Sequence, residues 1–248
     1  MNQVRLCPTD ENYVPLKEIS QHTVDAVIIS EDASFFDHKG FDWHEVYQSL
    51  ITNLKQGRLA RGGSTITQQL AKNVFLDSSK NPLRKMREFF LTREIESLFS
   101  KEEILERYFN VIELGPKIYG IKQASQYYFK KNPAHLNILE SAYIAFLLPN
   151  PKAHHAYFKQ GSLTDYARKR ILEICLRLYR FKKISRNDLE IANFRVVEFP
   201  WAGLSWTKNE LMSIVDEILI EETGAEDSTL PAIQEDFSEV DSNLFDNR

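Results

Sequence analysis

Apolar residues recur at helical spacing along most of the chain, and this pattern restricts the fold more than any other feature. After Trp43, apolar residues fall three or four positions apart up to a glycine suited to end a helix: Val46, Tyr47, Leu50, Ile51, Leu54 and Gly57. Such spacing is typical of an amphipathic helix. The chain has only nine glycines and nine prolines among 248 residues, few for a protein built from many short strands and turns. We therefore expect a mainly α protein.

Helix-capping signals predict where further helices begin. Thr65 with Gln68, and Ser100 with Glu103, have the spacing of a capping box. Asn81 and Pro82 suit the N-cap and first position of another helix. We expect Gly115 to end the helix that Ser100 begins. Further helices are expected over 121–131, 136–148, 165–182 and 188–193.

The organisation of the chain indicates one domain and a tail. We find no internal repeat or linker in residues 1–220. Residues 221–248 hold nine of the 35 acidic residues and one of the 31 basic residues, so we expect a disordered acidic tail there. The remaining net charge of +4 suits an anionic ligand or a lipid surface, although an ordinary solvated surface also explains it. Nucleic-acid binding would need denser Lys and Arg with interleaved aromatic residues.

Membrane insertion and disulfide formation find little support in the sequence. The longest apolar run, 142–148, is seven residues, whereas a spanning helix needs about 20. Residues 1–10 lack the features of a signal peptide, so a targeting signal or anchor is expected outside this chain. Cys7 and Cys175 have no metal-binding or redox spacing and are expected to be free thiols.

A polar and aromatic turn follows the apolar run 26–29. It places the ionisable groups of Glu31, Asp32 and His38 near Phe35 and ahead of Gly40. A carboxylate beside aromatic rings loses hydration, which raises its pKa toward the range of a general base. Helix capping by Asp32 or Asp37, together with a structural hydrogen bond from His38, is the alternative explanation of this turn.

The segment 62–73 has the composition of an anion site at the start of a helix. Glycines precede backbone N–H groups, hydroxyls, amides and a cation, and the residues involved are Ser64, Thr65, Gln68, Gln69, Lys72 and Asn73. A phosphate-bearing ligand would fit, but the order of residues is not that of a P-loop. Capping alone would explain Thr65 and Gln68, but not the two glycines and adjacent glutamines.

The helix beginning at Pro82 places two cations beside a carboxylate. Arg84 and Lys85 lie four and three residues before Glu88. We expect the apolar residues Leu83, Met86 and Phe90 to face inward. An ordinary surface ion pair is the alternative explanation for the charged group.

Together these segments resemble family 51 glycosyltransferases, the peptidoglycan polymerase domain of monofunctional transglycosylases and bifunctional penicillin-binding proteins. Five motifs match in order: Glu31-Asp32 with Phe35, His38, Gly40 and Asp42; 62–73; Arg84-Lys85 with Glu88; 101–105 with Tyr108 and Asn110; and Gly120 with Ala124, Tyr128 and Phe129. The resemblance is strong over residues 14–151. It implies a single lysozyme-like helical domain within residues 1–220.

The resemblance also implies roles for individual residues. Glu31 corresponds to the general base that deprotonates the 4-hydroxyl of the acceptor sugar, and Glu88 to a second carboxylate near the donor diphosphate. The implied substrate-binding residues are Asp32, Phe35, His38, Ser64, Thr65, Gln68, Gln69, Lys72, Asn73, Lys80, Arg84 and Lys85. Lys80 stands where many members have arginine, which replaces a bidentate fork by a point charge and weakens the expected phosphate contact.

The implied reaction polymerises lipid II into β-1,4-linked glycan by inverting displacement of undecaprenyl diphosphate. No cofactor is required, although a divalent cation such as Mg²⁺ could bind near Glu88. The implied partners are lipid II, the growing glycan strand, the membrane surface and other cell-wall synthesis proteins. The implied location is the outer, periplasmic face of the bacterial cytoplasmic membrane.

Hydrolase, scaffold and transpeptidase functions are less well supported by the sequence. A lysozyme-like hydrolase would not need the anion site at 62–73, and a catalytically silent scaffold would be expected to lose one of the two glutamates. A transpeptidase would need three separate elements, and only a match to the first, Ser205 to Lys208, is present.

Overall fold

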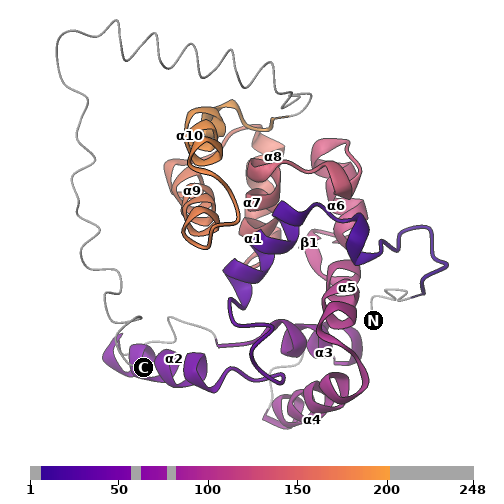
Figure 1. Ribbon diagram of the computed structural model, residues 1–248. Coiled ribbons are helices and arrows are strands. Elements are labelled where there is room, and N and C mark those ends of the chain that lie inside the picture. The colour runs from indigo at the N-terminus through magenta and orange to yellow at the C-terminus, as the bar shows by residue number, and fades with distance from the viewer. Residues whose placement is uncertain (1–6, 57–62, 77–81, 202–248) are drawn as a thin grey trace, which may run out of the picture. The chain divides into compact units, whose positions relative to one another are not determined.

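The computed structural model describes residues 7–56, 63–76 and 82–201, and these residues are mainly helical, which confirms the expected class (Figure 1). The α-helices are α1 (Gln21–Glu31), α2 (Trp43–Gln56), α3 (Ile66–Phe75), α4 (Pro82–Leu98), α5 (Lys101–Val111), α6 (Ile121–Phe129), α7 (Ile138–Leu147), α8 (Pro151–Gln160), α9 (Asp165–Arg180) and α10 (Arg186–Arg195). The 3-10 helices are η1 (Leu16–Glu18), η2 (Pro133–His135) and η3 (Val196–Glu198). Two short antiparallel strands, β1 (Glu113–Gly115) and β2 (Ile118–Tyr119), pair with each other.

Helix α7 is buried along its whole length and forms the centre of the packing. It contacts both α1 and α9 (Figure 1). A helix that is apolar all round belongs in a core. Its buried Glu140 is stabilised by a capping box with Asn137 and by a 2.7 Å ion pair to Lys131. This core fixes α1, because Thr23 of α1 shares a 2.8 Å hydroxyl hydrogen bond with Ser141 of α7.

The predicted capping boxes are both present. Thr65 caps α3 and Ser100 caps α5, each with the expected partner three residues later. Helix α2 ends at Gln56, directly before the glycine expected to follow it. The helices predicted over 121–131, 136–148, 165–182 and 188–193 correspond to α6, α7, α9 and α10.

Two local predictions differ from the structure, and one helix was missed. The apolar run 26–29 lies inside α1, so the turn expected directly after residue 29 begins only after Glu31. Helix α5 ends at Val111, not at Gly115, because Ile112 is extended and its carbonyl accepts a 2.9 Å hydrogen bond from Gly120 N–H, which leads into the hairpin of β1 and β2. Helix α8 was not predicted, although Asn150 and Pro151 carry the signal for its start.

The apolar face of α4 is turned outward, so the inward orientation predicted for it is wrong. Leu83, Met86 and Phe90 are 66%, 57% and 60% exposed. The buried face is formed by Glu88, Thr92 and Ile95, which lie on the opposite side of the helix. Helix α4 packs against α3, and this contact selects the polar face of α4.

The described residues fall in one compact unit, Met1–Leu204. The expected boundary at 220, the acidic tail 221–248, the Ser205 to Lys208 match, Lys80 and Asn81 lie outside the described residues. Both cysteines are free thiols, as expected.

Candidate active site

Glu31 ends α1 and contacts α3. Its Oε2 accepts a 2.7 Å hydrogen bond from Nε2 of Gln69. Burial raises the pKa of Glu31 above its ordinary value, and the charge of Asp32 adds to the rise. The Gln69 hydrogen bond and the charges of Lys72 and Arg177 act in the opposite direction. Glu31 therefore holds a proton more readily than an exposed glutamate does, which suits a general base.

Tyr108 of α5 fixes the orientation of the Gln69 amide. Its hydroxyl donates a 3.0 Å hydrogen bond to Oε1 of Gln69, which leaves the NH₂ group of Gln69 facing Glu31. Tyr108 is completely buried. Burial raises the pKa of its hydroxyl well above the ordinary value, and the charges of Glu31 and Asp32 raise it further. Tyr108 thus remains a hydrogen-bond donor to Gln69.

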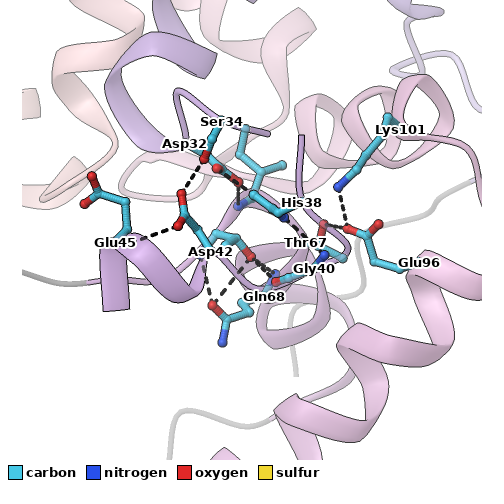
Figure 2. Close-up of polar contacts among 12 residues, drawn as sticks. Asp32, Ser34, His38, Gly40, Asp42, Glu45, Thr67, Gln68, Glu96 and Lys101 are labelled. Carbon is cyan, nitrogen blue, oxygen red and sulfur yellow. Dashed lines mark hydrogen bonds and ion pairs between the residues drawn. The ribbon is translucent and has the colours of Figure 1, made fainter. Parts of the chain in front are cut away.

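Asp32 and His38 join the turn after α1 to the start of α3 (Figure 2). Asp32 Oδ2 accepts a 2.9 Å hydrogen bond from the N–H of Ile66, and Asp32 Oδ1 accepts one of 2.9 Å from His38 Nε2. Since His38 Nδ1 accepts from the N–H of Gly40 at 3.1 Å, the imidazole hydrogen lies on Nε2. Both side chains, predicted to bind substrate, are thus engaged in holding the turn.

Gly40 allows the turn to approach α4 closely. Its φ of +86° is in the left-handed region, and a Cβ placed there would come within 2.8 Å of Thr92 Cγ2. Thr65 also donates a 2.7 Å hydrogen bond to the Gly40 carbonyl. The turn, α3 and α4 therefore meet at this residue.

Several other residues that were predicted to bind substrate instead form contacts within the protein. Thr65 and Gln68 form the capping box of α3 and are buried. Phe35 is completely buried, with the ammonium group of Lys101 4.4 Å from the centre of its ring. Lys101 and Thr67 both donate to Glu96 (Figure 2). These contacts position α3 beside Glu31.

Three predicted binding residues on or just before α3, Ser64, Lys72 and Asn73, have exposed side chains. Lys72 also exerts an electrostatic effect on Glu31. These polar side chains lie at the start and along α3, the helix that supplies Gln69. An anionic ligand could therefore contact α3 while it approaches Glu31.

Glu88 lies on the buried face of α4 and is held by two cations. Nη1 of Arg84 is 3.2 Å from its Oε2, and the ammonium group of Lys85 binds Oε1. Glu88 is only 3% exposed, whereas the Lys85 side chain is 55% exposed. Glu88 thereby fixes the position of both cations, of which Lys85 is exposed to a ligand.

Two residues near Glu31 had no role assigned from sequence. Tyr108 belongs to the motif formed by 101–105, Tyr108 and Asn110, but the motif alone does not show that its hydroxyl contacts Gln69. Arg177 affects the charge state of Glu31 from α9, which packs against α1. Arg177 lies 146 positions after Glu31, and no sequence pattern indicates that two residues so far apart are neighbours.

A comparison with known families agrees with this geometry. The family model described as "Transglycosylase" matches residues 2–177. The chain belongs to the transglycosylase family. The resemblance to family 51 glycosyltransferases is thereby confirmed. Helices α1, α3, α4 and α5, which carry the residues described above, all lie within the matched region.

Three curated relatives share one name, "Biosynthetic peptidoglycan transglycosylase". The Chromobacterium violaceum protein is 45% identical over 140 residues, which cover 56% of this chain and 61% of that protein. The Methylobacillus flagellatus protein is 39% identical over 165 residues, 66% of this chain and 71% of that protein. The Thiobacillus denitrificans protein is 48% identical over 140 residues, 56% of this chain and 60% of that protein. The matches to the first and third thus span about three fifths of the relatives' length.

Proposed function

We propose that the chain is a peptidoglycan glycosyltransferase that polymerises lipid II into β-1,4-linked glycan strands. The observation that carries this proposal is the half-buried carboxylate of Glu31, held by Gln69 beside the exposed polar side chains of α3. The names of the relatives support the same activity. A base next to a site for an anionic leaving group is what transfer from a sugar diphosphate requires.

In the proposed reaction, Glu31 accepts the proton of the acceptor 4-hydroxyl. The oxygen of that hydroxyl attacks C1 of the donor sugar, the new C1–O bond forms, and the bond from C1 to the diphosphate oxygen breaks. Undecaprenyl diphosphate leaves with the bonding electron pair. A single displacement inverts C1, which converts an α-linked donor into a β-linked product.

Cations on two helices would stabilise the leaving diphosphate. Lys72 is exposed on α3, and Lys85 and Arg84 are fixed on α4 by Glu88. Developing negative charge on the diphosphate would be met by donors already in position, which lowers the barrier to bond breaking. Glu88 acts in this proposal as a positioning residue for Arg84 and Lys85.

The proposal requires no cofactor. Across 7–56, 63–76 and 82–201, no three His, Cys, Asp or Glu side chains gather as a metal site, and both Glu88 oxygens are taken by cations. A divalent cation such as Mg²⁺, if it takes part, would have to be held largely by the diphosphate.

Besides lipid II and the growing glycan strand, we propose that the chain binds the outer, periplasmic face of the cytoplasmic membrane, where the lipid-linked substrate resides. Exposed apolar side chains support this: Trp43, Val46 and Tyr47 on α2, and Leu83, Met86 and Phe90 on α4. Exposed Arg87 and Arg93 on α4 would attract anionic head groups. Within the described ranges, no helix is both long and apolar enough to cross a bilayer.

Incubation with lipid II tests the proposed activity directly. Formation of glycan polymer with release of undecaprenyl diphosphate is expected. Release of free disaccharide without polymer would indicate a hydrolase instead, and no turnover would indicate a silent scaffold. The Glu31→Gln variant is the matched control, because its side chain has nearly the same shape but cannot accept the proton.

A further inference from the structure

A cavity of about 570 Å³ lies beside α1, and Glu31 does not line it. Its floor is apolar and is formed by Val24 and Ile28 of α1, Leu105 of α5 and Phe36 of the turn after α1. Ligand pockets typically measure about 300–1,000 Å³. The cavity is therefore large enough for a part of a substrate.

The cavity begins close to the proposed base. Val24 and Ile28 precede Glu31 by seven and three positions, so they lie on the same side of α1 as Glu31. Gln21, at the start of α1, also lines the cavity. From Ile28 back to Gln21, α1 rises about 10 Å along its axis, the length of about three extended residues.

Charges of both signs stand on the rim. Lys17 and Lys183 line the cavity, as does Glu102. Lys183 pairs with Asp25 at 3.0 Å, yet its side chain remains 44% exposed. The side chains of Lys17 and Glu102 are exposed and have no hydrogen bond or ion pair to any other residue in the described part of the chain. Two unneutralised charges of opposite sign therefore face the cavity.

Lys17 of η1 and Glu102 of α5 lie on the side of the cavity where these two helices contact each other. Lys17 follows Leu16, whose N–H donates a 2.8 Å hydrogen bond to Glu106. Glu102 lies one turn before Glu106 on α5, next to Lys101, which contacts Phe35 in the turn after Glu31. Both charges are therefore close to Glu106, a further acid that lines the cavity.

We propose that this cavity binds the peptide branch of the substrate. Carboxylates of the peptide meet Lys17 and Lys183, an amino group meets Glu102, and aliphatic side chains cover Val24 and Ile28. A neutral sugar would leave Lys17 and Glu102 without partners, and a lipid diphosphate has no cationic group for Glu102, whereas a peptide carries both a carboxylate and an amino group. The assignment rests on the proposed function, because the peptide reaches the protein only as part of a peptidoglycan precursor.

Substitutions at the rim test the proposal with two substrates, lipid II with its full peptide and the same lipid-linked disaccharide without the peptide. Lys17→Ala and Glu102→Ala are each expected to lower kcat/KM about three- to fivefold on the peptide-bearing substrate, as exposed ion pairs do. Neither should change kcat/KM on the peptide-free substrate. Lys17→Arg should restore the loss. Lys169→Ala, which removes an exposed lysine of α9 outside the cavity, is the matched control and should change neither.

The same comparison shows which substrate carries the bound peptide. Lipid II whose 4-hydroxyl is capped can act only as the donor, and a disaccharide without the diphosphate can act only as the acceptor. The peptide can therefore be present on the donor alone or on the acceptor alone. A loss seen in one arrangement supports the proposal and assigns the site to that substrate. Equal losses with and without peptide, or no loss in any arrangement, would overturn it. A wild-type chain that polymerises neither substrate would refute the proposed function instead.

Discussion

Removal of the Tyr108 hydroxyl should shift the pH dependence of the reaction. Tyr108 donates to Oε1 of Gln69, and this bond keeps the Gln69 NH₂ group on Glu31. In Tyr108→Phe the amide is free to turn, and Glu31 loses a donor that stabilises its carboxylate. The pKa of Glu31, already raised by burial, should rise further.

The size of this shift follows from the energy of the hydrogen bond that is at risk. A hydrogen bond to a charged group contributes about 1.5–3 kcal/mol, and about 1.4 kcal/mol corresponds to one pKa unit. Because Tyr108→Phe releases Gln69 without removing it, we expect the lower end, about one unit. Glu31 must be unprotonated to accept the hydroxyl proton. The acidic limb of the pH profile should therefore move to higher pH by about one unit.

The assay is kcat/KM for lipid II polymerisation across the acidic limb, together with the melting temperature. Tyr13→Phe is the matched control, because the Tyr13 hydroxyl donates to Glu106 and touches neither Gln69 nor Glu31. The control should leave the limb in place even if it lowers stability. An unchanged limb in Tyr108→Phe, or a loss of activity that is equal at every pH, would refute the positioning role of Tyr108.

Four further predictions follow from the same structure. Glu31→Gln should lower the rate of polymerisation about a hundredfold to ten-thousandfold. Because burial raises the pKa of Glu31, the charged carboxylate destabilises the fold at pH values above that pKa, so the melting temperature of Glu31→Gln should exceed that of the wild type at pH 8 but not at pH 4. Lys72→Ala should weaken binding of a moenomycin-type phosphoglycolipid in a titration, whereas Lys169→Ala should not, and equal affinity for Lys72→Ala would contradict the anion site. Replacing Leu83 and Phe90 of α4 by serine should reduce sedimentation with anionic vesicles more than Tyr166→Ser on α9 does. A chain ending at Ile220 should keep its melting temperature and polymerase activity, because residues 221–248 carry too little apolar sequence to offset their ordering entropy.

Local signals in the sequence predicted the parts of the fold that local chemistry determines. The capping box of Thr65 and Gln68 satisfies backbone donors within four residues, so the start of α3 follows from the sequence alone. Helix α1 gives no such signal. Residues 23–29 are all buried, and a helix buried on nearly every side has no alternation of polar and apolar faces to recognise.

Tertiary contacts decided what the sequence could not. The polar face of α4 is buried because it packs against α3, and the apolar face is exposed. This is the reverse of the orientation expected from the hydrophobicity of the two faces. The motifs placed Glu31 and Gln69 in the candidate site but gave no sign that they form a hydrogen bond. The use of Asp32 and His38 within the turn likewise depends on a contact with Ile66, 34 residues away from Asp32.

The separation of these contacts along the chain has a consequence for folding. Glu31 needs Gln69, 38 residues later, and Gln69 needs Tyr108, 39 residues later again, while α1 itself is fixed to Ser141. A contact between distant residues forms only when other contacts help to offset the entropy of closing the loop between them. A nascent chain released before α7 should therefore have no poised base even if α1 and α3 were already helical. Active enzyme should consequently appear in one cooperative step rather than by gradual gain as the chain grows.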